Sequence, residues 1–324
     1  MTGAAAPVVV VTSRSFSSGA FDLVGRLTEA GARVVRGATD HNLRSLRPVL
    51  AEAVAWVAGT APIMAEHLDA APRLKVIARY GVGFDSVNRQ AAAQRGILVT
   101  NTPGANSDAV AEHALALLLA ALRHIVAGNA AVRAQDWSVH RARELKNLSV
   151  GVVGFGRIGQ AFTSRLLPFG SAVLVHDPFV SAERVTAAGA EPVDLADMPA
   201  RCDVVSLHAP GGRVFVNAAW LEQASPGMIL INTARAALVN EQAVADALAG
   251  GRLASYAADD VGGGGSHPDS PLLSAEFADR VILTPHSAAQ TVEAVDNMGA
   301  SATAAVLAVL GGQTPPNLVE PPPV

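Results

Sequence analysis

Cysteine is almost absent from this chain: Cys202 is the only one among 324 residues. A single thiol cannot form an internal disulfide bond, and such sparse use of cysteine is typical of a reducing compartment. Cys202 opens the apolar run CDVVSLHAP, so we expect it to be an inert, buried thiol.

Charged residues and long apolar runs are also scarce. Only 16% of the residues are charged, the net charge is −4, and no five basic residues cluster, which argues against nucleic acid or an anionic membrane as a partner. The N-terminal segment lacks the positively charged region of a signal peptide. The most apolar stretch, residues 109–126, contains Glu112, Arg123 and His124, so it falls short of the roughly 18 apolar residues of a membrane span. We therefore expect a cytoplasmic protein.

Hydrophobic residues make up half of the chain, and its length is sufficient for two domains with separate cores. Short β-branched runs alternate with helical stretches, a pattern typical of parallel sheets flanked by helices. Residues 7–100 contain about five predicted strands, and a long alanine- and leucine-rich helix is predicted from about 107 to 127. Six further strands are predicted between residues 148 and 286.

The last predicted helix, about residues 291–310, follows the second series of strands and could fold back on the first. The sequence thus predicts an α/β protein of two doubly wound parallel-sheet domains, Rossmann-like or flavodoxin-like, with a cleft between them. One domain is expected from residues 1–102 and 291–324, and the other from residues 103–290.

A glycine fingerprint, Gly154-x-Gly156-x-x-Gly159, lies between a predicted strand (Ser149–Val153) and a predicted helix. In this context it indicates a dinucleotide site, because the glycines permit a tight turn and a close approach to the pyrophosphate. The helix N-terminus adds N–H donors at Arg157 and Ile158. Asp177 ends the next predicted strand and could bind the ribose hydroxyls while repelling a 2′-phosphate, which favours NAD over NADP. The alternative is a simple glycine turn with an exposed aspartate.

Several longer motifs then follow one another in a recognisable order. They are APRLKVIARYGVGFDSVN, GILVTNTPGANSDAVAEHALALLL, GVVGFGRIG, INTARAALVNEQAV and VILTPH. In these motifs the chain resembles the D-isomer-specific 2-hydroxyacid dehydrogenases, a family that includes D-3-phosphoglycerate dehydrogenase. The resemblance covers almost all of the chain. It implies that the domain of residues 1–102 and 291–324 binds substrate and that the other domain binds NAD.

The resemblance also assigns residues to the substrate. It implies that the loop of Tyr80, Gly81, Val82 and Gly83 binds the substrate carboxylate, for which its glycines free backbone N–H groups. It further implies that Arg235 binds the carboxylate and polarises the ketone, and that His286 is the acid/base. Both follow predicted strands, at the edge where open α/β sheets bind ligands. Ala236 and Ala237 stand where the family usually has two glycines.

Further cofactor contacts are expected at His208, Pro210, Thr233 and Asp259, and we expect no metal. When the chain is counted from Arg235 without a gap, Asp259 matches the family aspartate that holds the nicotinamide carboxamide. Five residues later the family has a glutamate that hydrogen-bonds the catalytic histidine, but here that position is Gly264, or Gly265 if the register is shifted by one. We interpret the run GGGG as a rebuilt active-site loop rather than as a phosphate-binding loop or a linker.

The most consistent function is an NAD-dependent D-2-hydroxyacid dehydrogenase acting on a small 2-hydroxy or 2-oxo acid. In it, His286 works either without the glutamate or with a substitute such as Asp269 or His267. The alternative is an NAD(H)-binding regulatory or scaffold protein of the same fold with little turnover. We expect a homodimer, because the helix of residues 109–126 is apolar around most of its circumference and the family has its interface there.

Overall fold

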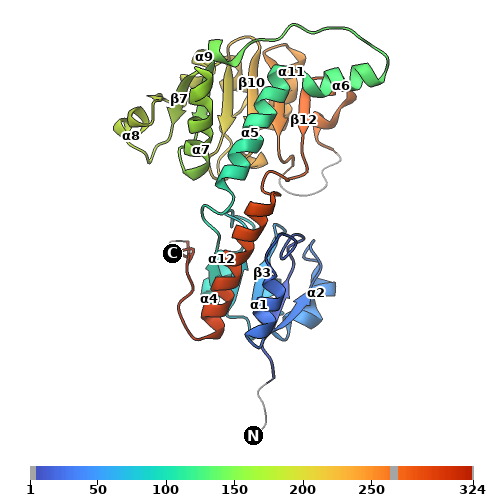
Figure 1. Ribbon diagram of the computed structural model, residues 1–324, viewed down its shortest axis with the longest axis vertical. Coiled ribbons are helices and arrows are strands. Elements are labelled where there is room, and N and C mark those ends of the chain that lie inside the picture. The colour runs from blue at the N-terminus through green and yellow to red at the C-terminus, as the bar shows by residue number, and fades with distance from the viewer. Residues whose placement is uncertain (1–4, 263–268, 323–324) are drawn as a thin grey trace. The chain divides into compact units, whose positions relative to one another are not determined.

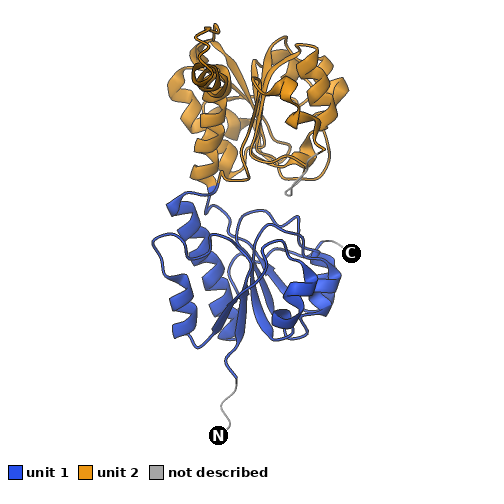
Figure 2. Cartoon of the chain, turned by 90° about the vertical axis from the view of Figure 1, so that its right-hand side faces the viewer, with its two compact units in different colours: residues 1–106, 289–324 blue, residues 107–288 orange. Residues whose placement is uncertain are grey.

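A computed structural model describes residues 5–262 and 269–322. The chain divides into two compact units, which are coloured separately in Figure 2. Unit 1 combines residues 1–106 with residues 289–324, and unit 2 consists of residues 107–288. The chain therefore leaves unit 1 just before the helix that begins at Ser107, and it returns after Ala288.

Unit 1 contains a sheet that has, in the described residues, five parallel strands in the order β2-β1-β3-β4-β5. The strands are β1 (Val8–Val11), β2 (Arg33–Arg36), β3 (Ala53–Ala58), β4 (Val76–Arg79) and β5 (Leu98–Thr100). All residues of β1, β3 and β4 are buried. This burial explains why their sequences are apolar runs rather than alternating ones, because helices cover both faces of the sheet.

The helices of unit 1 lie on both faces of this sheet. They are α1 (Leu23–Glu29), α2 (Leu43–Leu50), α3 (Ala65–Asp69), α4 (Arg89–Gln94) and α12 (Val292–Leu310). Helix α12 begins after Thr291, whose side chain accepts a hydrogen bond from the N–H of Ala294, and it packs against β3, β4 and α1 (Figure 1). Its buried Asp296 accepts hydrogen bonds from the backbone N–H groups of Ala20 and Phe21. The expected return of the C-terminal helix to the first domain is thus observed.

The sheet of unit 2 has seven parallel strands in the described residues, in the order β12-β11-β10-β9-β6-β7-β8. They are β6 (Ser149–Val153), β7 (Ala172–His176), β8 (Glu191–Pro192), β9 (Val204–Leu207), β10 (Met228–Asn232), β11 (Leu253–Ala258) and β12 (Val281–Leu283). The prediction of two parallel-sheet α/β domains is confirmed. The short, exposed β8 was not predicted, because two residues are too few to show a pattern.

Helices also cover both faces of the second sheet. They are α5 (Ser107–Leu122), α6 (Ile125–Arg133), α7 (Arg157–Leu166), α8 (Ala182–Ala187), α9 (Met198–Arg201), α10 (Ala218–Glu222) and α11 (Glu241–Ala249). Short 3-10 helices lie at Leu145–Asn147, Leu167–Phe169, Ala236–Leu238, Pro271–Leu273 and Ala275–Phe277. One core packs α5, α7 and α8 against the sheet, and the other packs α9, α10 and α11 against its opposite face. Strand β10 contributes to both cores, since Ile229 and Ile231 pack in the first core and Leu230 packs in the second.

The long helix expected from about 107 to 127 is interrupted close to its predicted end. Helix α5 ends at Leu122, and α6 leaves at an angle of 57° to it (Figure 1). The break occurs at His124, whose φ of 52° places its backbone in the left-handed region, where a helix cannot continue. Among the described residues no single helix is long and apolar enough to cross a membrane, although the bent pair passes that test by length and composition alone.

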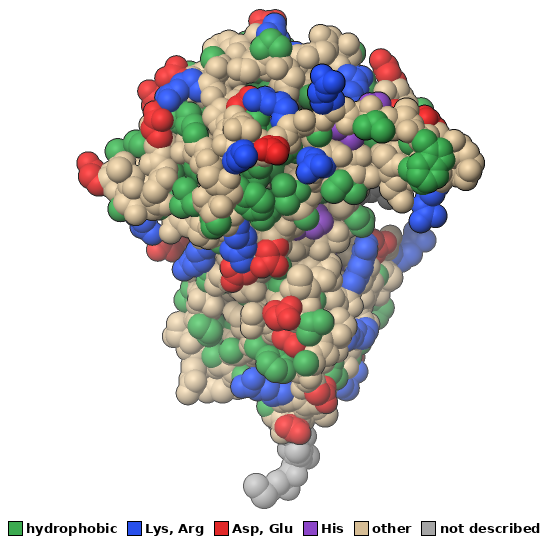
Figure 3. Space-filling model, turned by 45° about the horizontal axis from the view of Figure 1, so that its top comes forward, with side chains coloured by type: hydrophobic (Ala, Val, Ile, Leu, Met, Phe, Trp, Pro, Cys, Tyr) green, Lys and Arg blue, Asp and Glu red, His purple; other side chains and the backbone are tan. Residues whose placement is uncertain are grey.

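Cys202 is buried and its thiol is free, as predicted. Burial raises the pKa of this thiol to about 12, which keeps it protonated and unreactive. On the face shown in Figure 3, basic and acidic side chains are interspersed, so that face presents no extended patch of one sign.

Candidate active site

The glycine fingerprint follows β6, where the strand order of the sheet changes direction. Strands β7 and β8 lie on one side of β6, and β9 to β12 lie on the other. Open α/β sheets bind their ligands outside the carboxyl ends of the strands at such a switch point. The loop that carries Gly154, Gly156 and Gly159 is therefore placed by the topology itself at the expected ligand position.

Each of these glycines meets a different steric demand. Gly154 has a φ of 94°, and a Cβ there would lie 2.7 Å from the backbone nitrogen of Ala209. A Cβ on Gly159 would overlap the carbonyl oxygen of Gly154, so this glycine permits close packing of α7 on the strand. Gly156 has open space where its Cβ would stand, and α7 begins at the next residue. The loop thus leaves room for a phosphate beside the free N–H groups of a helix N-terminus.

Asp177 lies directly after β7 and is tied to the same loop. One oxygen of its carboxylate accepts a hydrogen bond from the N–H of Phe155 (2.7 Å), and the other accepts one from the N–H of Phe179 (2.8 Å). These bonds hold a negative charge beside the glycine loop. The carboxylate keeps further lone pairs that can accept hydrogen bonds from hydroxyl groups.

His208 and Thr233 follow β9 and β10, and each has a buried polar atom without a hydrogen-bond partner among the described residues: His208 Nδ1 and Thr233 Oγ1. The Nε2 atom of His208 lies 2.9 Å from Ser206 Oγ, and its ring packs against Phe162. Burial lowers the pKa of His208 to about 3, so the ring is neutral. Unsatisfied buried polar atoms at a sheet edge fit a site built to take a polar ligand. Pro210 is exposed in the same region.

Arg235 is positioned by the turn that follows β10. The buried side chain of Asn232 braces this turn, since its Nδ2 donates to the carbonyl of Arg235 (2.9 Å) and its Oδ1 accepts from the N–H of Ala234 (3.1 Å). Nη1 of Arg235 donates to the carbonyl of Ala234 (2.7 Å). Asn232 belongs to the motif INTARAALVNEQAV, but its role in the turn was not predicted, because a bracing function leaves no signal beyond the residue type.

Asp259 is buried at the end of β11 and holds the segment that carries His286. Its carboxylate accepts hydrogen bonds from Thr284 Oγ1 (2.5 Å) and from the N–H groups of Ser287 (2.9 Å) and Ala288 (2.8 Å). Nε2 of His113, on α5, lies 3.4 Å away. Burial raises the pKa of Asp259, but the hydrogen bonds from His113, Thr284 and the two N–H groups outweigh it, so the pKa is lowered overall.

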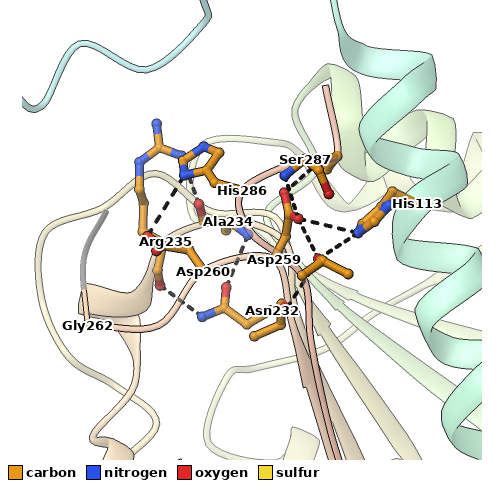
Figure 4. A network of polar contacts seen from close by, with 12 residues as sticks. His113, Asn232, Ala234, Arg235, Asp259, Asp260, Gly262, His286 and Ser287 are labelled. Atoms are coloured by element: carbon orange, nitrogen blue, oxygen red, sulfur yellow. Dashed lines mark hydrogen bonds and ion pairs between the residues drawn. The ribbon is translucent and has the colours of Figure 1, made fainter. Parts of the chain in front are cut away.

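His286 follows β12 with a φ of 54°, and its N–H donates to the carbonyl of Thr284 (2.9 Å). Its side chain is 44% exposed, in contrast to the buried network beneath it. Nδ1 of its ring lies 4.0 Å from Oδ2 of Asp260. In Figure 4, His286 and Arg235 extend from the same end of the sheet, above Asn232 and Asp259. The sequence did not predict the position of Asp260 near His286, because nothing in the chain's local pattern distinguishes Asp260 from the neighbouring Asp259.

Gly264, Gly265 and His267 lie outside the described residues, whereas Asp269 is described and exposed. The groups of Asp, Glu, His and Cys in the described ranges form no cluster that could hold a metal ion.

The loop of Tyr80 to Gly83 belongs to unit 1 and follows β4. Its carbonyl groups are engaged from Gly81 onward: Gly81 accepts from the N–H of Thr102, Val82 from the side chain of Asn101, and Gly83 from Nε of the buried Arg79. The N–H groups of Gly81, Val82 and Gly83 form no hydrogen bond with other described residues. A loop whose carbonyl groups already accept hydrogen bonds from the protein, and whose N–H groups remain available, can bind an anion.

Tyr80 itself contributes differently from that loop. Its ring is buried and its hydroxyl donates a hydrogen bond to the carbonyl of Val295 on α12 (2.9 Å). Burial raises the pKa of this hydroxyl. The side chain therefore anchors α12 to the end of β4, and what it offers to a ligand in this structure is its backbone.

Comparison with known proteins identifies the family. Residues 115–288 match the model of the D-isomer specific 2-hydroxyacid dehydrogenase, NAD binding domain, and the chain belongs to that family. This match confirms the predicted cofactor, NAD.

The similar proteins differ in the substrates that their names state. The chain is 44% identical over 262 residues to a D-3-phosphoglycerate dehydrogenase of Mycobacterium tuberculosis, covering 79% of this chain and 48% of that protein. It is 36% identical over 268 residues to a glyoxylate reductase of Thermococcus litoralis, covering 78% of this chain and 79% of that one. A crystal structure of D-lactate dehydrogenase from Aquifex aeolicus with NAD and lactic acid is 27% identical, with a TM-score of 0.85 over 98% of this chain and 100% of that one. The chain thus spans about half the length of the D-3-phosphoglycerate dehydrogenase that it matches.

Proposed function

We propose that this protein is an NAD-dependent oxidoreductase that interconverts a D-2-hydroxy acid and its 2-oxo acid. The observation that carries the proposal is the common edge of the unit 2 sheet. The Gly154 loop follows β6, Arg235 follows β10 and His286 follows β12, and these strands are all parallel. A nucleotide-binding loop, a guanidinium and an imidazole are therefore gathered at one end of one sheet.

Each residue of the proposed site has a separate role in the reaction. NAD, when bound, supplies the hydride acceptor or donor. The Arg235 guanidinium binds the substrate carboxylate and polarises the ketone, since its planar fork can serve two oxygens at once. The His286 imidazole gives a proton to the substrate oxygen during reduction and takes one during oxidation. The N–H groups of Gly81, Val82 and Gly83 are available as further donors to an anionic group of the substrate, and for this reason we propose residues 1–102 and 291–324 as the substrate-binding domain.

The NAD-binding domain, residues 103–290, holds the dinucleotide through a different set of groups. The N-terminus of α7 and the glycine loop would hold the pyrophosphate, and Asp177 would accept hydrogen bonds from the ribose. His208, Pro210 and Thr233 line the site, and Asp259 contributes near the nicotinamide. The orphaned atoms of His208 and Thr233 support this assignment, because a polar ligand would satisfy them.

The direct test is NADH consumption against 2-oxo acids that include glyoxylate, pyruvate and 3-phosphohydroxypyruvate. We expect turnover of at least one of them by the native chain and its loss in Arg235→Gln. Binding of NADH should be measured in parallel by titration. Tight NADH binding without turnover of any 2-oxo acid would contradict the proposal.

That contrary outcome defines the second candidate, an NAD(H)-binding regulatory or scaffold protein of the same fold. The observation that favours it is the glycine at position 264, where the family has a glutamate. The retained Arg235 and His286 at the sheet edge favour the enzyme, because a purely nucleotide-binding protein needs neither a second anion clamp nor an acid/base.

We also infer that the protein forms a homodimer, and we propose that its contact lies on the segment after α5 rather than on α5 itself. Helix α5 buries one side in the core, whereas α6 has no buried residue. The exposed apolar side chains of this segment are Ile125, Val126, Val132, Trp137 and Val139. Light scattering at micromolar concentration should give twice the chain mass, and Ile125→Glu with Val132→Glu should reduce it. A monomeric native protein would contradict this inference.

A further inference from the structure

Asp259 and Asp260 follow β11, and their side chains point to opposite sides of the sheet edge. Asp259 is buried, and its carboxylate is engaged by Thr284 and by the N–H groups of Ser287 and Ala288, on the side of α5. Asp260 has a side chain that is 17% exposed, and its carboxylate faces the His286 ring. This difference follows from extended backbone, in which successive side chains point to opposite sides.

The distance between Asp260 and His286 is set by strand pairing. Strands β11 and β12 are parallel neighbours, with Ala258 paired with Leu283. Asp260 lies two residues beyond the first of these and His286 three beyond the second, so both side chains are carried to the same sheet edge. There Oδ2 of Asp260 lies 4.0 Å from Nδ1 of His286 (Figure 4).

We propose that Asp260 is the positioning residue for His286, and that its carboxylate takes over the role that a glutamate has in the family, at the position that is Gly264 in this chain. The inference rests on the proposed function. The separation of 4.0 Å is that of a charge pair rather than of a hydrogen bond. Catalytic hydrogen bonds are often long without substrate and shorten in the complex.

The atoms involved suit this role. Because Nδ1 of His286 faces Asp260, a proton on Nδ1 can be donated to that carboxylate, and Nε2 is left for the substrate. Nε2 then accepts the hydroxyl proton during oxidation, and the carboxylate stabilises the resulting imidazolium. During reduction the same proton passes from Nε2 to the substrate oxygen, and the ring returns to the neutral Nδ1–H form.

The other charged groups of this region do not position the His286 ring. Arg235, from the turn after β10, brings a positive charge that opposes the imidazolium. Asp259 is occupied by the backbone that follows His286, and His113 on α5 contacts Asp259 rather than the His286 ring. Asp269 is exposed, and no contact joins it to His286 within the described ranges. The structure therefore favours Asp260 over Asp269, the acid that the sequence had suggested.

The test uses three substitutions at one position. Asp260→Asn removes the charge but keeps an acceptor, Asp260→Ala removes both, and Asp260→Glu restores the carboxylate. Asp269→Asn is the matched control, since it neutralises an exposed acid of the same loop. The full-length chain is labelled with ¹⁵N-histidine, and the His286 ring is assigned by its absence in His286→Gln.

We expect the ring of His286 to lose its proton at lower pH in Asp260→Asn than in the native protein, by roughly half a pH unit or more. The Nδ1–H tautomer should be depleted in Asp260→Ala, and Asp260→Glu and Asp269→Asn should both resemble the native protein. Unchanged titration and tautomer in both Asp260→Asn and Asp260→Ala would overturn the proposal.

Kinetics give a second readout. At a pH above the midpoint of the ring titration, lowering that midpoint by one pH unit reduces the protonated fraction about tenfold. The kcat for 2-oxo acid reduction at pH 8 should therefore fall several-fold in Asp260→Asn, with a smaller change in KM and partial recovery at lower pH. A fall that is equal at every pH would assign Asp260 a merely structural role and overturn the proposal. If the native chain reduces no 2-oxo acid, the proposed function fails, whereas the NMR experiment still decides the role of Asp260.

Discussion

Each unit contains a histidine and an arginine in the vicinity of a strand end, but the two pairs are built in opposite ways. In unit 1, His41 and Arg79 are 3% and 4% exposed. In unit 2, His286 is 44% exposed and Arg235 is only half-buried. The same residue types thus lie in the core in one unit and at the exposed sheet edge in the other.

The unit 1 pair is satisfied by protein groups. Nε2 of His41 accepts a hydrogen bond from Thr12 Oγ1 (2.7 Å), and its Nδ1 donates to the carbonyl of Pro62 (3.1 Å). Thr12 Oγ1 in turn accepts from the indole N–H of Trp56 (2.9 Å). Arg79 donates to the carbonyls of Ala58, Gly59 and Gly83. A histidine whose two nitrogens are both committed to the interior is a structural group, whereas Nε2 of His286 has no hydrogen-bond partner within residues 5–262 and 269–322.

The largest expected effect is a difference in kcat between variants of His286 and variants of His41. His286→Gln should reduce kcat for 2-oxo acid reduction by ~10²- to 10⁴-fold, since it removes the proposed acid/base. Its thermal midpoint should stay within about 2 °C of the native value, because an exposed ring contributes little to packing. His41→Asn should show the reverse pattern, with a lowered midpoint and kcat within about threefold of the native value. Equal losses of stability in the two variants would contradict the comparison.

Lowering the pH should destabilise the folded protein through protonation of His41. Burial, with the charges of His67 and Arg79, lowers the pKa of His41 from 6.5 to about 4, although the Pro62 carbonyl and Asp40 oppose this change. The neutral ring is therefore the folded form. Its contribution is complete above pH 6.5 and is lost as the pH falls from 6.5 towards 4, because the unfolded chain binds this proton first.

The loss should amount to about 3 kcal/mol, at 1.36 kcal/mol per pKa unit. Denaturant unfolding of the native chain and of His41→Asn at pH 7, 5.5 and 4 measures it. Asparagine tolerates the left-handed backbone of position 41 (φ 56°) and does not titrate. The variant should be less stable at pH 7 and should lose about 3 kcal/mol less than the native chain on acidification. Parallel pH curves for the two proteins would show that His41 is not the responsible group.

Substitution of Arg235 should reduce activity, and substitution of Arg79 should reduce stability, as for the two histidines. Arg235→Lys keeps the charge but removes the planar fork, so kcat/KM should fall by ~10²-fold or more, about 2.7 kcal/mol of transition-state binding. NADH affinity, measured by fluorescence titration, should be nearly unchanged. Arg79→Lys serves as the comparison and should lower stability, because a single ammonium replaces a guanidinium that reaches three carbonyls. A native rate in Arg235→Lys would mean that the substrate is bound elsewhere.

The smallest expected effect concerns the choice of cofactor at the edge of unit 2. Asp177 is held beside the glycine loop by the N–H groups of Phe155 and Phe179. A 2′-phosphate would be repelled by this carboxylate, so we expect NADH to bind at least ~10-fold more tightly than NADPH. Asp177→Ser should narrow the difference. Equal affinity of the native protein for the two cofactors would refute this role for Asp177.

Much of the architecture could be predicted because it depends on local patterns. The apolar runs of β1, β3 and β10 mark strands buried on both faces, and Gly154 and Gly159 mark a strand-to-helix turn that larger residues would obstruct. The helix break at His124 could not be predicted, because its apolar surroundings resemble an uninterrupted helix and only the backbone conformation reveals the turn. Arg235 and His286 were identified by their motifs, which are also local.

By itself the sequence determined the two parallel-sheet domains, the family and the residues that offer a nucleotide loop, a guanidinium and an imidazole. These properties lie in periodicity and in short motifs, each read within a few neighbouring residues. Only the tertiary structure decided which of several acids lies near His286. Two adjacent aspartates are equivalent in a sequence, but the register of β11 on β12 directs Asp259 into the hydrogen-bond network behind the edge and Asp260 towards the ring. The roles of these carboxylates follow from the surroundings that strand pairing provides, and those surroundings are assembled from segments far apart along the chain.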